Sequence, residues 1–313
     1  MMSSFGPTYV VEPREGYAHD HTAILLHGRG SNGEEFADEL FATALSDPQT
    51  PSLADRLPSW RWVFPSSPST WNATFEEWMP AWFEAHSLAD PTARQDLQQA
   101  GLRASVQNVV EIVELEIQRL GAIDSKSLSD AHARLVLGGI SLGGAVALWT
   151  LLGTDLPDRP LGGFAVMSTW LPFSNEIMMY LGEQADAEAE AVQPGETGTG
   201  SDSKPLEGLA FVQKAMSPLR QHLRNRHTGD ETGHSIAKPS VLTTPVFLGH
   251  GRDDAYVDVE LGRQVHQLLI DVGFNEVQWR DYKGAEQEGH WLKEPEEMDD
   301  LARFLEAVGG RNR

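Results

Sequence analysis

One serine of this chain lies in surroundings that suit nucleophilic chemistry. An apolar segment at 135–138 leads through Gly139-x-Ser141-x-Gly143 into a second apolar segment. Glycines on both sides let a strand and the following helix pack closely, so that the turn between them exposes the serine hydroxyl at a sheet edge. The short pattern alone is weak evidence in a chain with 29 glycines. The flanking apolar segments are what favour Ser141 as a nucleophile.

A nucleophilic serine needs a base and an acid that orients the base, and in this setting both follow it along the chain. Asp254 lies just beyond the apolar segment 245–249, and His290 lies between the last expected strand and the closing helix. Asp253 is the nearest alternative acid, and the sequence separates the two aspartates only weakly. A lone histidine is more often a surface residue, but this position would return His290 to the serine. We therefore expect a catalytic triad of Ser141, Asp254 and His290.

Backbone amides near the serine could stabilise a negatively charged substrate oxygen. Leu142 supplies the N–H directly after the nucleophile, and Arg29 within His27-Gly28-Arg29-Gly30 supplies a second. The neighbouring glycines let the backbone of this loop approach a substrate carbonyl. The loop lacks the G-x-x-x-x-G-K-[ST] and G-x-G-x-x-G patterns of phosphate-binding loops, so an oxyanion hole is the expected role.

Strands and helices alternate along the sequence, which predicts an α/β fold with a mostly parallel central sheet and helices on both faces. Ser31 or Asn32 is expected to cap the first helix. Besides the strand before Ser141, the expected strands are Thr22–Leu26, Arg61–Phe64, Leu161–Ser168, Pro245–Gly249 and Glu276–Tyr282. Besides the helix after Ser141, the expected helices are Glu34–Leu45, Ala100–Leu120, Val259–Leu269 and Pro295–Val308.

The length favours a single domain over residues 1–313, with an insertion at about 181–240. The first part of this insertion is acidic and poor in large apolar residues, which predicts a flexible loop. Its second part repeats apolar residues at helical spacing, at Leu209, Val212, Met216, Leu219 and Leu223. We expect a helix packed on the domain surface; a lid over the active site is the alternative.

The composition excludes several function classes. With 24 Lys and Arg against 46 Asp and Glu, the net charge of −22 would repel nucleic acids and anionic lipid surfaces. The absence of cysteine excludes disulfides, thiolate metal sites and palmitoylation. The chain starts with no basic and apolar leader, and no apolar run reaches 18 residues. We expect a cytoplasmic protein with no nucleic-acid partner and no stable membrane insertion.

Two further clusters of side chains invite a functional interpretation. His19, Asp20 and His21 are three possible metal ligands in a row, but neighbours in an extended segment point alternately. We expect a solvated strand entry there, with no metal site. Aromatic residues gather near the expected loops, where they could be core or could line an apolar acyl groove. They are Trp71, Trp78, Trp82, Phe83 and Trp170.

Several blocks of the chain together resemble the acyl-protein thioesterase, carboxylesterase and phospholipase family of α/β-hydrolases, over residues 20–180 and 241–310. The blocks are Leu26-His-Gly-Arg-Gly30, Phe64-Pro65, Met79-Pro-Ala-Trp-Phe-Glu84, Gly139-Ile-Ser-Leu-Gly-Gly144, Ser168-Thr-Trp-Leu-Pro172, His250-Gly-Arg-Asp-Asp254 and Gly289-His290. The resemblance implies the α/β-hydrolase fold, Asp254 as the triad acid and Arg29 as an oxyanion donor. It also implies that the segment with Trp170 and Leu171 borders the substrate groove. From the aromatic cluster, we expect Trp82 there as well.

The sequence thus predicts a serine hydrolase that cleaves acyl thioesters or carboxylic esters through an acyl-serine intermediate, with no metal or organic cofactor. The resemblance points most to an acyl-protein thioesterase, whose substrate would be an S-acylated protein. A small-molecule carboxylesterase and a lysophospholipase remain alternatives. From another class, a non-catalytic binding module on the same fold remains open as well.

Overall fold

A central sheet of parallel strands with one antiparallel edge organises the molecule. The computed structural model describes residues 4–72, 76–87, 90–123, 128–154, 160–180, 211–217 and 241–310. The strand order is β1-β3-β2-β6-β7-β8-β9; β1 pairs with β3 in antiparallel register, and the other neighbours are parallel. The strands are β1 (Tyr9–Val11), β2 (His21–Leu26), β3 (Trp60–Phe64), β6 (Leu135–Ile140), β7 (Gly163–Met167), β8 (Val246–Gly251) and β9 (Val277–Tyr282). The predicted mostly parallel sheet is confirmed.

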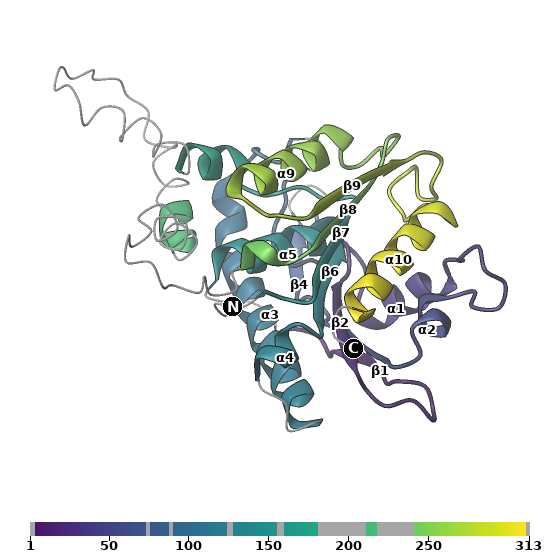
Figure 1. The fold of residues 1–313 in the computed structure, drawn as a ribbon. Helices are drawn as coiled ribbons and strands as arrows, with labels where there is room; N and C mark the ends of the chain where they lie inside the picture. Colours follow the sequence, from purple (N-terminus) through teal and green to yellow (C-terminus); the bar gives the residue numbers. More distant parts are fainter. Residues whose placement is uncertain are drawn as a thin grey trace, which may run out of the picture.

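Helices cover both faces of the sheet (Figure 1). One face carries α3 (Gln95–Ile123), α4 (Leu128–His132), α5 (Ser141–Gly153) and α9 (Val259–Val272). The other carries α1 (Gly33–Ala42), α2 (Leu53–Arg56) and α10 (Glu296–Gly310). A short 3-10 turn, Val241–Thr243, leads into β8.

The core consists of two apolar layers, one on each side of the sheet. Successive residues of a strand point to opposite faces. In β2, Ile24 and Leu26 therefore join the layer beneath α3 and α5, whereas Ala23 and Leu25 join the layer beneath α1 and α10. Strands buried on both faces read as continuous apolar runs, which is why β2, β6, β7 and β8 could be predicted from the sequence.

The helix boundaries differ from the expected ones by a few residues. Of the two candidate caps, Asn32 caps α1: its side-chain oxygen accepts the N–H groups of Glu34 and Glu35. α3 continues through Gly121 to Ile123. A glycine costs a helix only about 1 kcal/mol relative to alanine, and the buried face of α3 outweighs that cost.

A two-stranded hairpin, β4 (Ser69–Asn72) and β5 (Glu77–Pro80), lies outside the main sheet and was not predicted. It carries two exposed tryptophans, Trp71 and Trp78, whose rings meet edge to face with centroids 6.0 Å apart. The other clustered aromatics, Trp82, Phe83 and Trp170, are buried. The aromatic cluster of the sequence is thus divided between the core and a surface hairpin.

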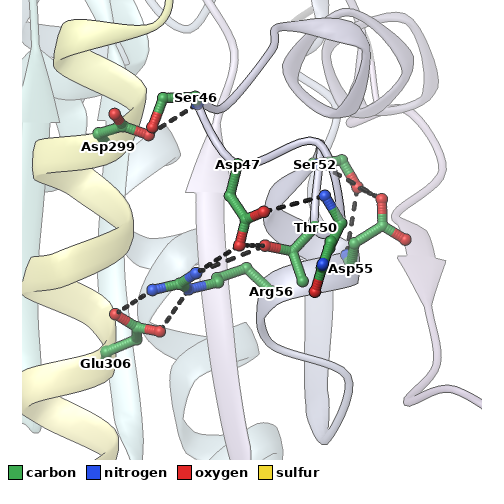
Figure 2. Close-up of polar contacts among 9 residues, drawn as sticks. Ser46, Asp47, Thr50, Ser52, Asp55, Arg56, Asp299 and Glu306 are labelled. Atoms are coloured by element: carbon green, nitrogen blue, oxygen red, sulfur yellow. Dashed lines mark hydrogen bonds and ion pairs between the residues drawn. The ribbon is translucent and has the colours of Figure 1, made fainter.

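Polar contacts fasten α2 and the segment before it to helix α10 (Figure 2). The Arg56 guanidinium pairs with Glu306, with Nε 2.5 Å from Oε1. The backbone N–H of Ser46 donates to Asp299 Oδ1 at 3.0 Å. The partners lie about 250 residues apart in the chain. We call these contacts the α10 clamp; they hold the helix that directly follows the His290 loop.

Most of the predicted insertion at 181–240 lies outside the described residues, including Leu209, Leu219 and Leu223. The described part, 211–217, is helical, and its Val212 and Met216 side chains are fully buried in the core. These contacts match the packed-helix interpretation; the single-domain organisation stays a prediction. No helix in the part of the chain described is long and apolar enough to cross a membrane.

Candidate active site

Ser141 lies at a sharp turn between β6 and α5. Its φ of 55° falls in the left-handed region that residues other than glycine rarely adopt. A Cβ at Gly143 would lie 2.4 Å from the carbonyl oxygens of Leu26 and His27, and one at Gly139 would lie 2.6 Å from that of Leu26. The close approach of β2 therefore requires both glycines, and the surrounding packing holds the serine in its strained conformation.

His290 and Asp254 form a partly buried hydrogen-bonded pair. The Nδ1 atom of His290 lies 2.7 Å from Asp254 Oδ2, and the Asp254 side chain has no exposed surface. The second carboxylate oxygen accepts the backbone N–H groups of Tyr256 at 2.8 Å and Val257 at 2.9 Å. An ionised carboxylate only accepts, so the proton belongs on Nδ1, and Nε2 is left able to take a proton.

The loop before His290 has an unusual backbone. Gln287, Glu288 and Gly289 have φ values of 49°, 55° and 84°, three left-handed residues in succession. The carbonyl of Glu288 accepts the N–H of Ala255 at 3.0 Å, which ties this loop to the Asp254 loop. The strained run thus turns the chain back after β9 and brings His290 to the aspartate.

Asp253, the alternative acid in the sequence, has a different partner. Both of its carboxylate oxygens accept the backbone N–H of Gly284 at 3.1 Å. Its carboxylate therefore serves the turn after β9, and the imidazole of His290 is paired with Asp254.

The loop after β2 lies against the serine. A Cβ at Gly28 would lie 3.5 Å from Ser141 Cβ and 4.0 Å from Ser141 Oγ, so the Gly28–Arg29 peptide runs beside the nucleophile. Leu142 lies in the first turn of α5, where backbone N–H groups have no partner within the helix. Both expected oxyanion donors thus belong to segments next to Ser141.

Ser141 and His290 line the same cleft, which has a volume of about 430 Å³. This volume is within the range of small-molecule sites, about 300–1,000 Å³. Its apolar wall comes from Phe36, Ile140, Tyr256 and Trp291, and its other lining residues are Gly28, Arg29, Ser31, Glu39, Gln287 and Glu288. The rings of Tyr256 and His290 meet edge to face with centroids 5.3 Å apart.

Phe36 and Tyr256 line the cleft but were not expected there from the sequence. The available signal was their position, in the first helix after the Gly-rich loop and two residues after the triad acid. The expected groove residues Trp82, Trp170 and Leu171 are buried and are not among the residues that line the cleft. Their role in substrate binding stays a prediction.

The His19–His21 segment also differs from expectation. His19 Nε2 lies 2.9 Å from Thr22 Oγ1, and His21 is buried, with its ring stacked on Trp60 at 5.0 Å. The expected solvated entry is wrong for His21, because β2 begins at this residue and its side chain packs inside. Among the described residues, no group of three His, Cys, Asp or Glu side chains could hold a metal ion.

A strained serine after a central parallel strand, followed along the chain by an Asp–His pair, defines the α/β-hydrolase class of protein. The chain belongs to the phospholipase/carboxylesterase family, whose model matches residues 8–185 and 232–308. The predicted family resemblance is confirmed.

Known relatives agree with this assignment. Acyl-protein thioesterase 1 of Mycosarcoma maydis is 34% identical over 307 residues, covering 96% of this chain and 96% of the relative. Acyl-protein thioesterase 1 of Cryptococcus neoformans var. neoformans is 28% identical over 176 residues, 56% of this chain and only 64% of the relative. The crystal structure of Zea mays acyl-protein thioesterase 2 has a TM-score of 0.58 at 23% identity, covering 97% of this chain and 99% of that chain. This likeness shows the shared fold.

Proposed function

We propose that the protein is a serine hydrolase that cleaves acyl thioesters or carboxylic esters through an acyl-serine intermediate, most like an acyl-protein thioesterase. The observation that carries the proposal is the 2.7 Å bond between His290 Nδ1 and the buried Asp254, in a cleft that also contains the strained Ser141. Family membership supports the same chemistry.

In the first half-reaction, Ser141 Oγ attacks the acyl carbonyl carbon while His290 Nε2 takes the hydroxyl proton. Asp254 holds the imidazole in the Nδ1–H tautomer and stabilises the imidazolium that forms. The tetrahedral intermediate carries its negative charge on the former carbonyl oxygen, where the backbone N–H groups of Arg29 and Leu142 donate to it.

The intermediate collapses when the bond to the thiolate or alkoxide leaving group breaks and the imidazolium returns the proton to that group. Water then attacks the acyl-serine, His290 accepts a proton from the water, and the same two N–H groups stabilise the second oxyanion. The carboxylic acid leaves and Ser141 regains its proton. These steps use side chains and backbone groups of this chain together with water.

An S-acylated protein is the substrate we propose, and the cytoplasm is the compartment. The relatives named acyl-protein thioesterase favour this substrate. The cleft offers Phe36, Ile140 and Trp291 as an apolar surface suited to an acyl chain. A lysophospholipid or a small ester would leave the triad chemistry unchanged and alter only the leaving group.

The test combines active-site labelling with a substrate panel. The native protein is expected to react with a fluorophosphonate, and Ser141→Ala to lose both labelling and hydrolysis, about 10⁴-fold or more in kcat. Thioesters and oxyesters of matched acyl length, S-acylated peptides and lysophosphatidylcholine then rank the leaving groups. Labelling that persists in Ser141→Ala would refute the nucleophile, and an unlabelled, inactive native protein would favour a binding module.

A further inference from the structure

A second histidine lies behind the active site, directly after β2. His27 is fully buried, and both of its ring nitrogens have close polar neighbours. Nδ1 lies 2.6 Å from the carbonyl oxygen of Gly28, and Nε2 lies 3.0 Å from the backbone nitrogen of Ser67. The proposed mechanism gives this side chain no role.

The two neighbours fix the proton on the ring. A carbonyl oxygen can only accept, so Nδ1 must donate to Gly28; a backbone N–H can only donate, so Nε2 must accept from Ser67. Only the neutral Nδ1–H tautomer of His27 satisfies both bonds. Burial lowers the pKa of His27 to about 4, which keeps the ring in this neutral form at physiological pH.

The bond to Gly28 has a geometric consequence for the neighbouring residue. The carbonyl of Gly28 and the N–H of Arg29 belong to one planar trans peptide, so they point in opposite directions. A side chain that holds the carbonyl oxygen on the buried side therefore directs the N–H to the other side, and this peptide runs beside Ser141.

We infer that His27 is a positioning residue that aims the Arg29 N–H at the developing oxyanion through its hydrogen bond to the Gly28 carbonyl. The inference rests on the proposed function, because it assigns His27 to the oxyanion hole of that reaction. Trp82 lies behind the site as well, where its indole donates to the backbone carbonyl of His27.

Neighbouring contacts hold the peptides on either side. The carbonyl of His27 accepts the indole N–H of Trp82 at 2.8 Å, and the two rings lie 5.0 Å apart. The N–H of Gly30 donates to the carbonyl of Pro80 at 2.8 Å. The His27 bond secures the Gly28–Arg29 peptide between these two anchors, so its loss would allow that peptide to rotate.

Two amide substitutions separate the two ring bonds. Asn places an N–H near the Nδ1 position, whereas Gln places an acceptor near the Nε2 position. We expect His27→Gln to lower kcat by about 10²-fold, as the loss of one oxyanion donor does, with KM within about threefold. His27→Asn should retain at least about tenfold more kcat than His27→Gln.

Ser66→Ala is the matched control for general loosening of the loop. Ser66 Oγ accepts the N–H of Gly33 at 3.0 Å at the far end of the same loop and donates to the carbonyl of Pro7 at 2.7 Å. This variant should lower Tm while kcat stays within about threefold of the native value. Equal kcat losses in His27→Asn and His27→Gln, or none in either, would overturn the inference.

Two measurements give readouts that a purely structural role would not move. Affinity for a trifluoromethyl ketone, which forms a tetrahedral oxyanion on Ser141, should fall in parallel with kcat/KM across the His27 variants. In the native protein, the ¹⁵N shifts of the His27 ring should report a neutral Nδ1–H tautomer from about pH 5.5 to 8. A charged ring or the Nε2–H tautomer would also overturn it, and this measurement needs no variant to fold.

The failure of this inference and that of the proposed function are distinguishable. Labelling of Ser141→Ala by a fluorophosphonate would refute the proposed function whatever the His27 variants do. An inactive Ser141→Ala beside a fully active His27→Gln would refute only the role of His27.

Discussion

Asp253 and Asp254 are adjacent, but their side chains point in different directions and have different hydrogen-bond partners. Asp254 is buried and bonded to His290, whereas Asp253 accepts the backbone N–H of Gly284. Adjacent residues in a turn project to different sides, so the residue type alone could not assign the roles. In the structure, the position of the imidazole and the burial of the Asp254 side chain distinguish the two carboxylates.

Asp254→Asn and Asp253→Asn should differ strongly in activity. An amide at 254 would donate as well as accept and would favour the wrong imidazole tautomer, so kcat/KM should fall by about 10⁴-fold. Asp253→Asn keeps the oxygen that accepts from Gly284 and should stay within about threefold of the native value. Steady-state kinetics on a short oxyester measures both, and a larger loss for Asp253→Asn would move the orienting role to that residue.

A buried carboxyl beneath the His290 loop carries a second prediction. Glu297 has almost no exposed surface, and its Oε2 accepts the N–H of Lys293 at 2.8 Å. Its Oε1 has no hydrogen-bond partner among the described residues. A Cβ at Gly249 would lie 2.1 Å from Oε1, so the carboxyl lies directly against β8. Burial raises the pKa of Glu297 to about 8.

The sign of the pH dependence follows from this shift. In the unfolded chain Glu297 ionises near its ordinary value, about 4.3, while the folded protein keeps its proton up to about pH 8. The contribution to the free energy of unfolding is therefore complete below the unfolded pKa and is lost as the pH rises through the folded pKa. Urea unfolding should show stability falling between about pH 5 and 8, and Glu297→Gln should flatten this slope. An identical slope in both proteins would contradict the assignment.

At the scale of elements, the helix at 211–217 decides between a lid and a packed surface helix. The ring of Phe211 lies 5.1 Å from that of Trp149 and 5.0 Å from that of Phe173, with centroids as the reference points. Val212 and Met216 are fully buried. None of these side chains lines the cleft of Ser141.

The corresponding prediction concerns Val212→Ser combined with Met216→Ser. Truncating each of these two buried apolar side chains should lower the free energy of unfolding by up to about 5 kcal/mol. Tm should therefore fall clearly. The dependence of kcat/KM on acyl length should keep its profile. The exposed Gln213→Ser is the control, with no expected effect on Tm. A changed dependence of kcat/KM on acyl length at an unchanged Tm would instead support the interpretation of this helix as a lid.

The elements that could be predicted are those whose pattern is set by burial on two faces. β2, β6, β7 and β8 are short apolar runs, and the turn after β6 carries its glycines for a visible steric reason. The edge strand β1 has only three residues, and the β4–β5 hairpin is short and partly polar, so tertiary pairing and not sequence pattern defines them.

The candidate site divides in the same way. Ser141, Asp254 and His290 could be proposed because each lies just after a strand, where a parallel sheet gathers its loops. The residue type does not determine the direction in which an aromatic side chain points. Trp82 was expected in a groove, but it is buried and its indole donates to the carbonyl of His27. Phe36 and Tyr256 line one cleft only because the fold brings α1 near the loop after β8.

At the scale of the whole molecule, the candidate site draws on almost the full width of the sheet. Its groups follow β2, β6, β8 and β9, and β7 lies between two of these strands. Hydrolysis therefore needs the parallel strands to be assembled in register. The site is a property of the whole sheet, and no single element contains it.

The α10 clamp extends this dependence to the order in which the structure forms and comes apart. It joins Ser46 and Arg56 to Asp299 and Glu306, which lie about 250 residues further along the chain. Contacts of such separation close late, because the intervening chain must be ordered first. Surface ion pairs contribute only about 0–1 kcal/mol each, and the buried side chains of Leu301, Phe304 and Leu305 supply most of the attachment of α10. Loss of the clamp should therefore loosen α10 locally while the rest of the sheet stays folded.

The fourth prediction follows for Arg56→Met, which removes the pair with Glu306. Its hydrolytic activity should disappear at a lower urea concentration than its far-UV circular dichroism, with a wider gap between the two midpoints than in the native protein. Arg94→Met, which breaks an exposed pair with Asp96 remote from the clamp, is the control and should leave the gap unchanged. Coincident midpoints in Arg56→Met would contradict the idea. Hydrolytic activity would then be the last property to appear during refolding. It would also be the first to be lost under denaturing conditions, while most of the sheet is still intact.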